Sequence, residues 1–380
     1  MAWSVVFAPD SFKGSLTSVD VAAALARGWG RARPDDTLLL APLADGGEGT
    51  LVAIEAAGGW EPQTVRATDP IGRPIEARWL RSADGRRAFV ELAAASGLSR
   101  LSAAERDPLG ASTFGTGEVL LAAIETGVRR ITLGIGGSAT NDGGEGILRA
   151  LGVRFDPSRG AADLSGVDPR LAEIDLRIAC DVTNPLLGER GAAATYGPQK
   201  GAGPDQVAEL DRRLARYANA LEEAAGRSER DSPGAGAAGG TGFGLLCLRD
   251  RLRSLELVPG VELVMDETDL AGKLAGADLV VTGEGRVDAQ TAFGKTALGV
   301  AQRAAAARVP CLAVGGGVTP EGIAALAPLG VVVVPVAEGP GSVEDAMAAG
   351  AAPIERCGER IARLISLGAA HSAANRPDRQ

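Results

Sequence analysis

A glycine-rich segment near the middle of the chain constrains the fold more than any other feature. Residues Ile131–Gly146 read ITLGIGGSATNDGGEG, in which a β-branched stretch is followed by glycines interleaved with Ser138, Thr140, Asn141, Asp142 and Glu145. Glycine allows positive φ angles and close approach of the backbone to a ligand, and the helix expected near Gly144 would direct its positive end to the same place. A tight turn could explain one such loop, but the chain carries four, so the pattern favours phosphate binding.

The composition indicates an α/β protein with a small-molecule partner. The 380 residues are 45% hydrophobic, 23% charged and only 3% aromatic, with 53 glycines, as expected for aliphatic strands, Ala-rich helices and many tight loops. This length fits two domains, or one large domain with an insertion. The formal net charge of −9 argues against nucleic-acid binding, which needs concentrated Lys and Arg.

Several locations and chemistries are disfavoured. No stretch approaches the roughly 20 apolar residues of a membrane span, and the start lacks a basic leader, so we expect a cytoplasmic protein without membrane contact. The cysteines form no Cys-x-x-Cys pair, which favours small buried hydrophobes over disulfides or zinc ligands: Cys180, Cys247, Cys311 and Cys357. The only histidine, His371, lies in the polar C-terminal tail, so histidine-based catalysis is not expected.

Hydrophobic periodicity predicts alternating strands and helices at both ends of the chain. The expected strands are Trp3–Ala8, Thr37–Leu40, Asp278–Thr282, Cys311–Val314 and Val331–Val334, and the expected helices include Ser18–Trp29, Thr50–Ala57 and Pro353–Leu367. Such alternation is typical of parallel βαβ units. We therefore predict an α/β fold in which residues 1–62 and 277–370 build one doubly wound parallel-sheet domain, followed by a flexible tail at 371–380.

The middle of the chain, residues 63–276, is predicted to be an inserted α/β domain. Alternating residues broken by turn signals between Thr64 and Leu92 indicate a β-meander. Further along we expect a helix at Gly117–Glu125, a strand at Leu176–Cys180 and a long polar helix at Pro204–Ala225. Residues 226–240, GRSERDSPGAGAAGG, have the composition of a flexible connection.

Polar loops follow the expected strands in both domains. In the first domain these loops are Asp10–Lys13, Asp45–Gly49, Gly283–Asp288 and Gly315–Gly317, and in the second they are Gly134–Asp142 and Asp181–Asn184. Ligands of open parallel sheets bind at the carboxyl ends of the strands. We therefore expect the two domains to face each other across a polar crevice.

Three segments come close to known phosphate-binding patterns. Residues 289–296, AQTAFGKT, resemble a Walker A loop without its first glycine, and Lys295 remains a candidate phosphate contact. Gly234, Gly236 and Gly239 have the dinucleotide spacing but follow a polar, proline-containing segment instead of a strand. The series Gly134, Gly136 and Ala139 does follow an expected strand, so nicotinamide binding is a serious alternative, although no clean strand carries an acidic ribose ligand about 20 residues later.

Individual charged residues in these loops are functional candidates. Lys13 would be unfavourable at a helix start unless an anion binds there too. Asp45, among glycines, is a candidate catalytic or metal-binding residue, with Glu48 a weaker one, and Asp181 is a candidate for metal binding or proton transfer. Glu284, Asp288 and Lys295 combine acid and base near one strand end. The alternatives are helix-start charges, turn formers and chance surface charges.

Seven motifs together resemble the glycerate kinases of bacterial glycerate and glyoxylate metabolism. They are APDSFKGSL (8–16), PLADGGEGT (42–50), IGGSATNDGG (135–144), CDVTNPLLG (180–188), YGPQKGA (196–202), GAGAAGGTGFG (234–244) and TGEGRVDAQTAFGKT (282–296). The resemblance implies ATP-dependent phosphorylation of D-glycerate, with 2-phosphoglycerate the commoner product, and a flavodoxin-like domain built from both chain ends around an inserted domain. Tyr196, where phenylalanine is frequent, is a small departure.

The resemblance and the chemistry of phosphoryl transfer together suggest roles for these residues. That reaction mainly requires positioning of ATP, Mg²⁺ and an acceptor hydroxyl, together with charge neutralisation, and needs no histidine. The expected nucleotide contacts are Gly136, Gly137, Ser138, Ala139, Thr140, Asn141 and Lys295. Lys13 is assigned as a catalytic electrostatic clamp. Asp45, Asp181 and Asp288 are candidates for Mg²⁺ binding and for accepting the hydroxyl proton, without distinction among them.

The expected glycerate contacts are Ser11, Lys13 and Arg286, because a guanidinium can hold a carboxylate with two hydrogen bonds. The expected partners are therefore ATP and D-glycerate, with Mg²⁺ as cofactor and a homodimer as a candidate assembly. Two other classes stay open, namely a nicotinamide-dependent hydroxyacid dehydrogenase and a non-catalytic nucleotide-binding module.

Overall fold

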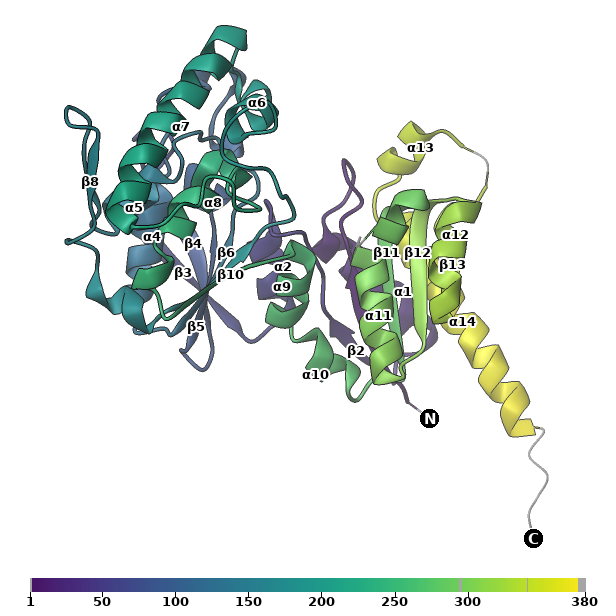
Figure 1. Cartoon of the computed structure of the whole chain (residues 1–380). Helices are drawn as coiled ribbons and strands as arrows, with labels where there is room; N and C mark the ends of the chain where they lie inside the picture. The colour runs from purple at the N-terminus through teal and green to yellow at the C-terminus, as the bar shows by residue number, and fades with distance from the viewer. Residues whose placement is uncertain (1, 294–295, 340, 375–380) are drawn as a thin grey trace. The chain divides into compact units, whose positions relative to one another are not determined.

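The chain forms two compact units (Figure 1). The computed structural model describes residues 2–293, 296–339 and 341–374. Unit 1 contains the chain up to Ala44, Val52–Gly58 and the chain from Val264 onward. Unit 2 contains Asp45–Leu51 and Gly59–Leu263. Contacts thus group the loop at Asp45 with the middle of the chain, and α2 (Thr50–Ala57) and α9 (Gly260–Glu267) cross the division.

Unit 1 is built on a five-stranded parallel sheet in the order β13-β12-β11-β1-β2. The strands are β1 (Ser4–Pro9), β2 (Thr37–Leu40), β11 (Leu279–Val287), β12 (Cys311–Val318) and β13 (Val332–Pro335). β1 therefore lies between a strand that follows it closely in sequence and one from the far end of the chain. The order changes direction between β1 and β11, which makes this the topological switch point of the sheet.

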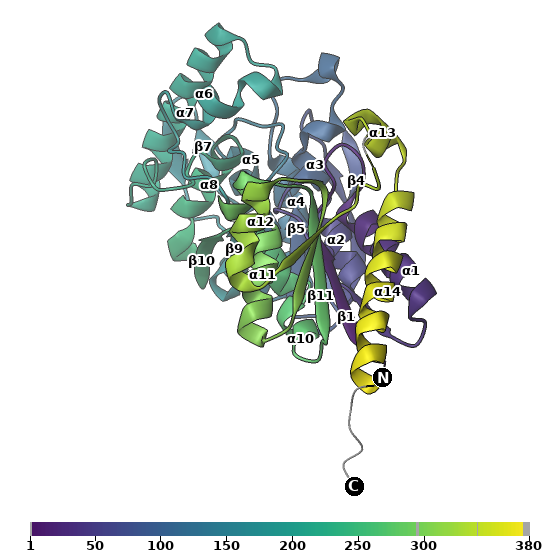
Figure 2. The ribbon, with the colours of Figure 1, turned by 90° about the vertical axis from the view of Figure 1, so that its right-hand side faces the viewer.

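Helices of unit 1 lie on both sides of its sheet, as Figure 2 shows. With η marking a 3₁₀ helix, they are α1 (Ser18–Ala32), α10 (Leu270–Leu274), η6 (Ala289–Phe293), α11 (Thr296–Ala307), α12 (Pro320–Leu326), η7 (Ala327–Leu329), α13 (Val343–Ala348) and α14 (Ala352–Ala374). On one side, α1 and α14 pack with Val5, Phe7 and Val281 in a single core. Glycine brings these two helices together, since a Cβ on Gly28 would lie 1.8 Å from the Glu355 carbonyl oxygen.

Two strands of unit 1 are longer than the sequence predicts. We expected strands to end at Thr282 and Val314 with loops after them, but β11 continues to Val287 and β12 to Val318. The glycine-rich stretches pair as strands, with Glu284 opposite Gly315 and Arg286 opposite Gly317. In a sequence, glycine usually indicates a loop. Here it allows neighbouring strands to pack closely, because a Cβ on Gly283 would lie 2.4 Å from the Val314 side chain.

Unit 2 contains a six-stranded mixed sheet in the order β10-β9-β6-β5-β4-β3. Its strands are β3 (Trp60–Thr68), β4 (Pro74–Ser82), β5 (Arg87–Glu91), β6 (Arg130–Gly134), β9 (Asp175–Ala179) and β10 (Ser254–Val258). The first three form the antiparallel meander expected from the sequence, and β5, β6, β9 and β10 run parallel. A small antiparallel pair, β7 (Arg154–Asp156) and β8 (Ala161–Asp163), lies outside this sheet.

The helices of unit 2 enclose one large aliphatic core with strand residues such as Leu133 and Ile178. They are α3 (Ala93–Ser96), η1 (Leu98–Arg100), η2 (Ala103–Glu105), α4 (Phe114–Glu125), α5 (Glu145–Ala150), η3 (Pro169–Glu173), α6 (Ala192–Tyr196), η4 (Pro198–Lys200), α7 (Pro204–Ala225), α8 (Ala237–Cys247) and η5 (Arg249–Arg251). The expected long helix at Pro204–Ala225 matches α7 residue for residue, and α5 begins directly after Gly144 as predicted.

The prediction of a flexible connection at residues 226–240 is wrong. This segment lies within unit 2 and is packed, with Ala235 and Ala237 buried in the core. The Glu222 carboxylate accepts hydrogen bonds from the backbone N–H groups of Glu229 and Arg230 and from the Arg230 guanidinium. Polar composition resembled a linker, but here the charged residues satisfy one another and hold the segment in place.

At the C-terminus, α14 continues to Ala374, four residues into the segment predicted to be a tail. The Ala-rich sequence around His371 favours continuation of the helix, which corrects the prediction for residues 371–374. Residues 375–380 lie outside the described residues. The cysteines are all free, as expected, and Cys180 is less buried than the other three.

Candidate functional site

The first candidate site, in unit 1, lies where β1 ends beside the last part of β11. Asp10 follows β1, and its N–H donates to the Gly283 carbonyl oxygen at 2.8 Å. Its carboxylate accepts hydrogen bonds from the Ser11 N–H at 2.6 Å and from the Thr296 hydroxyl at 2.7 Å. Asp10 therefore ties the loop that carries Ser11 and Lys13 to the start of α11. The Lys13 side chain is exposed.

The end of β11 contributes a second set of polar groups to this edge. Glu284 is buried and accepts a hydrogen bond from the Thr291 hydroxyl at 2.6 Å, and the same hydroxyl oxygen accepts one from the Asp288 N–H. The Asp288 carboxylate accepts from the Gln290 N–H and pairs with the exposed Arg286 guanidinium at 3.3 Å. The structure thus brings Arg286 and Asp288 together, and both Asp288 oxygens have partners within the loop. Lys295, also expected here, lies outside the described residues.

The second candidate site, in unit 2, forms where two glycine-containing loops touch. The Gly136 N–H donates to the Gly46 carbonyl oxygen at 3.3 Å. A Cβ on Gly136 would lie 2.5 Å from the Gly47 Cα, and one on Gly46 would lie 2.4 Å from the Ala179 side chain at the end of β9. These glycines are therefore required by close backbone contact. The contact brings the Asp45 loop, the central glycine-rich loop and the end of β9 together.

Asp45 and Asp181 lie next to each other at this junction. The Asp181 carboxylate accepts a hydrogen bond from the Gly260 N–H at 2.9 Å, and Asp45 accepts one from the Gly47 N–H at 3.1 Å. A Cβ on Gly260 would contact both the Asp45 carbonyl oxygen and the Asp181 Oδ2. Desolvation raises the pKa of Asp181, the Gly260 N–H opposes this rise, and the Asp45 charge adds to it. Both side chains remain exposed, so the pair can meet a ligand.

A buried carboxylate that the sequence analysis missed supports the Asp45 loop. Glu91, at the end of β5, is only 6% exposed and accepts hydrogen bonds from the Gly49 and Leu51 N–H groups at 3.1 and 2.9 Å. Burial raises its pKa, those two hydrogen bonds lower it, and the nearby Glu48 charge raises it further. The available signal was a single acidic residue ending the apolar strand RAFVE.

The central glycine-rich loop is less open than the sequence suggests. Gly136 and Gly137 are its accessible part, whereas Ser138, Ala139, Thr140 and Asn141 are buried. The Ala139 N–H donates to the Ser96 carbonyl oxygen, so neither it nor the Gly136 N–H is left for a ligand in this conformation. Asp142 has a structural role, because its carboxylate accepts hydrogen bonds from the N–H groups of Thr113, Gly144 and Gly146.

The glycine series 234–239, which has the dinucleotide-binding spacing, packs against the central glycine-rich loop. Ala238, Gly239 and Gly240 have positive φ, and the Gly239 carbonyl oxygen accepts a hydrogen bond from the Gly143 N–H at 3.0 Å. A Cβ on Gly239 would lie 1.9 Å from the Thr140 carbonyl oxygen. The sequence spacing therefore reflects packing of two backbones.

Nicotinamide binding at Gly134, Gly136 and Ala139 would require that the next strand in sequence lie parallel to β6 in the same sheet. That second strand is missing here. The strand that follows β6 in sequence is β7, which belongs to a separate two-stranded sheet. The parallel neighbours of β6 are β5 and β9. An acidic residue that binds ribose would have to end such a neighbouring strand about 20 residues downstream.

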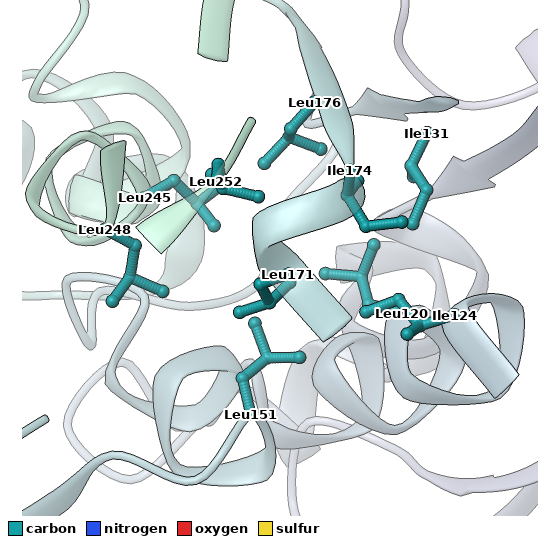
Figure 3. Close-up of a pocket in the computed structure, with 10 residues that line it drawn as sticks. All are labelled: Leu120, Ile124, Ile131, Leu151, Leu171, Ile174, Leu176, Leu245, Leu248 and Leu252. Carbon is teal, nitrogen blue, oxygen red and sulfur yellow. The ribbon is translucent and has the colours of Figure 1, made fainter. Parts of the chain in front are cut away.

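An apolar hollow of about 20 Å³ lies at the other end of the unit 2 sheet (Figure 3). It is lined by Leu120, Ile124, Ile131, Leu151, Leu171, Ile174, Leu176, Leu245, Leu248 and Leu252. Ile131 and Leu176 stand near the amino ends of β6 and β9, whereas the polar loops leave the carboxyl ends. With only aliphatic side chains around it, the hollow offers no hydrogen-bonding group to a polar ligand.

Two properties of the described residues bear on partners. No helix there combines the length and apolar character needed to cross a bilayer. Nor do His, Cys, Asp and Glu side chains in that part of the chain gather in threes or more around a common metal position.

Parallel strands that end in glycine-rich and acidic loops are typical of α/β proteins that bind phosphate-containing ligands. Comparison with known proteins makes the class specific: the chain belongs to the glycerate kinase family, whose sequence profile matches residues 5–366. Family membership makes it a phosphotransferase enzyme and confirms the resemblance drawn from its motifs.

Individual relatives agree over most of the chain. It is 45% identical to a glycerate kinase of Halalkalibacterium halodurans over 82% of this chain and 85% of that one. It is 42% identical to the glycerate 2-kinase of Escherichia coli over 83% and 86%, and 40% identical to a glycerate kinase of Bacillus subtilis over 96% and 98%. A crystal structure described as glycerate kinase 2 from Salmonella typhimurium superposes with a TM-score of 0.83 at 39% identity, covering 97% of this chain and 100% of that one.

Proposed function

We propose that this enzyme transfers the γ-phosphoryl group of ATP to D-glycerate, with 2-phosphoglycerate favoured over 3-phosphoglycerate. The observation that carries the proposal is the Asp45 and Asp181 pair beside Gly136 of the glycine-rich loop. In the reaction, a glycerate hydroxyl oxygen forms a bond to the γ-phosphorus as the bond to the β–γ bridging oxygen breaks. ADP leaves, and the hydroxyl proton must be accepted by the protein.

Asp181 is the better proton acceptor of the pair. A raised pKa brings a carboxylate nearer the operating pH, which improves general-base catalysis. Asp45 is then the first candidate Mg²⁺ ligand, since Mg²⁺ in such enzymes is commonly bound by one or two carboxylates plus substrate phosphates. When bound, Mg²⁺ would supply positive charge to the phosphates. Asp288 is a weaker candidate for either role, because both its oxygens already have partners.

We assign the remaining contacts by charge. Gly136 and Gly137, the accessible part of the loop, face the nucleotide phosphates, with Ser138, Ala139, Thr140 and Asn141 shaping the loop behind them. Lys13 and Lys295 neutralise phosphate charge, and Ser11 and Arg286 bind glycerate. The exposed Arg286 would release Asp288 to hold the glycerate carboxylate.

The proposal also covers the domain architecture and the cellular location of the protein. We propose a flavodoxin-like domain from residues 1–62 and 277–370 and an inserted domain from 63–276. The order β2-β1-β11-β12-β13 supports the first, because it is the 2-1-3-4-5 order of flavodoxin-like sheets when the strands are renumbered along the chain. A cytoplasmic location and a homodimer also stay predictions.

The proposal is tested by measuring ADP release from purified protein with ATP, Mg²⁺ and D-glycerate. We expect turnover that needs all three components, and ³¹P NMR of the product should show phosphate on the 2-hydroxyl. Absence of ADP formation by folded protein across a panel of 2-hydroxy and 2,3-dihydroxy acids would contradict the proposal. Turnover that yields only 3-phosphoglycerate would leave kinase activity standing and overturn the regiochemistry.

A further inference from the structure

The motif YGPQKGA places a lysine inside unit 2 to which the function above gives no role. Lys200 ends η4 and is only 2% exposed. Its ammonium group donates to the Ser138 hydroxyl oxygen at 2.8 Å and to the Thr140 carbonyl oxygen at 2.5 Å. Both acceptors belong to the central glycine-rich loop, so Lys200 holds that loop from its buried side.

The buried charge of Lys200 is not neutralised within the loop. The negative charge of Asp142 favours the charged form of Lys200, but the Asp142 carboxylate accepts hydrogen bonds from Thr113, Gly144 and Gly146. Within the described part of the chain, no carboxylate forms an ion pair with Lys200. Arg106, packed beside Gly201, is another cation. A buried cation without a counter-charge is unfavourable, and a bound anion would reduce that cost.

Further polar atoms beside Lys200 lack partners. The Thr140 hydroxyl and both polar atoms of the Asn141 side chain are buried, with no hydrogen-bond partner among the described residues. The hydroxyl belongs to Thr140, whose carbonyl oxygen accepts a hydrogen bond from Lys200. The other two atoms belong to the next residue, Asn141. Unsatisfied polar groups of this kind are uncommon in native proteins and often mark functional sites.

We propose that Lys200 is a positioning residue for nucleotide phosphate binding, which fixes Ser138 and Thr140 from beneath and gives the exposed Gly136–Gly137 turn a positive potential. Lys200 acts through the loop and does not touch the ligand. The inference rests on the proposed use of ATP. Burial also lowers the pKa of Lys200 to about 7, with Asp142 opposing the shift, so an arriving anion would increase protonation of Lys200 near neutral pH.

The test compares Lys200→Met with a matched control, Lys273→Met. Lys273 is a partly buried lysine that likewise donates two hydrogen bonds, to the carbonyl oxygens of Ala57 and Thr268 at 2.9 and 2.7 Å, but it lies in unit 1. Calorimetric titration with the non-hydrolysable analogue AMPPNP and Mg²⁺, and separately with tripolyphosphate, measures both affinities. We expect Lys200→Met to weaken both by about tenfold or more and Lys273→Met to leave them within twofold of the native protein.

Proton uptake on ligand binding provides a second measurement. Replacing a lysine that has only a structural role would leave this uptake unchanged. Titration at pH 7 in two buffers of different ionisation enthalpy should show proton uptake on binding by the native protein and by Lys273→Met. If Lys200→Met does not fold by circular dichroism, Lys200→Arg, which keeps its charge through neutral pH, should bind tripolyphosphate without that uptake. Equal affinity in Lys200→Met, or unchanged uptake in Lys200→Arg, would overturn the inference.

The outcomes also separate this inference from the proposed function. If tripolyphosphate binding depends on Lys200 but no phosphoryl group is transferred to D-glycerate, the proposed function is wrong and the inference about Lys200 stands. If D-glycerate is phosphorylated but binding does not depend on Lys200, the proposed function stands and the inference is wrong. Failure of the native protein to bind either probe would overturn the inference directly.

Discussion

Three aspartates in the polar loops of unit 2 have different surroundings. Asp142 accepts several backbone hydrogen bonds and organises its own loop. Asp181 accepts one backbone hydrogen bond, remains exposed and lies beside the charge of Asp45. A carboxylate whose acceptor positions are filled is committed to structure, whereas one with unfilled positions can receive a proton or a metal ion. The role of each aspartate therefore depends on its neighbours more than on its motif.

We predict that Asp181→Asn and Asp45→Asn each lower kcat by about 10²-fold or more, because each removes a group that acts in the transition state. The exposed Asp163→Asn, on β8, is the control and should keep its activity. Circular dichroism should match the native spectrum in all three. A nearly native kcat in Asp181→Asn would remove it from the reaction.

The same pair predicts a pH effect. A base must be unprotonated, so the raised pKa of Asp181 places the acid limb of kcat/KM above the ordinary value of 3.8. Asp45→Asn removes the neighbouring negative charge, which lowers the pKa of Asp181 and should move that limb to lower pH. The residual activity of Asp45→Asn, measured from pH 4 to 8, checks the direction. A limb that stays in place or moves upward would argue against coupling between the two carboxylates.

At the scale of elements, one side chain joins the first strand, the first helix and the second strand of unit 1. Asp36, just before β2, accepts hydrogen bonds from the Trp3 N–H at 2.9 Å, the Trp29 indole N–H at 2.8 Å and the Arg33 guanidinium. Burial raises the pKa of Asp36, but the Arg33, Trp3 and Trp29 hydrogen bonds outweigh it and leave the pKa below 3.8. The ionised carboxylate therefore stabilises this corner.

Asp36→Asn should lower the free energy of unfolding by about 1–3 kcal/mol at pH 7, since charged hydrogen bonds are lost. A lowered folded-state pKa gives stabilisation that is present above pH 3.8 and lost as the pH falls through the folded-state value. The difference from the native protein should therefore shrink below about pH 4. Urea unfolding at several pH values measures it, with the neighbouring exposed Asp35→Asn as control. A pH-independent difference would point to packing instead of charge.

Element prediction succeeded where one signal was present and failed where two competed. Thr37–Leu40 and Thr50–Ala57 are found at the expected bounds, because apolar periodicity there is uninterrupted by glycine. The extensions of β11 and β12 were missed because their glycines indicate loops locally, and only strand pairing across the sheet shows why glycine is needed. Likewise, no local pattern could reveal that Glu91 supports the Asp45 loop, since the two segments are distant in sequence.

At the scale of the whole molecule, the apolar hollow and the proposed binding site occupy opposite ends of the unit 2 sheet. The hollow lined by Leu171 lies at the amino ends of β6 and β9, and the aspartate pair lies at the carboxyl end of β9. Leu171→Ala should cost about 2–5 kcal/mol of stability by enlarging the hollow. The KM for ATP should stay unchanged, because the site loops are remote from it.

Thermal unfolding and steady-state kinetics of Leu171→Ala check both halves of this expectation. Leu364→Ala is the matched control, since Leu364 is 61% exposed on α14 and should change stability by no more than about 0.5 kcal/mol. A rise in the KM for ATP in folded Leu171→Ala would show that the two ends of the sheet are coupled.

The pairing of β1 with β11 determines the order in which the chain can be completed during synthesis. Ser4 and Asp278, hydrogen-bonded at this pairing, are 274 positions apart. At about 5–20 residues per second, a ribosome needs roughly 14 to 55 s to make the intervening chain. By the end of that interval every strand of the unit 2 sheet has been made, whereas β1 still has only β2 as a neighbour. The nascent enzyme thus carries an unpaired strand edge until its last third emerges.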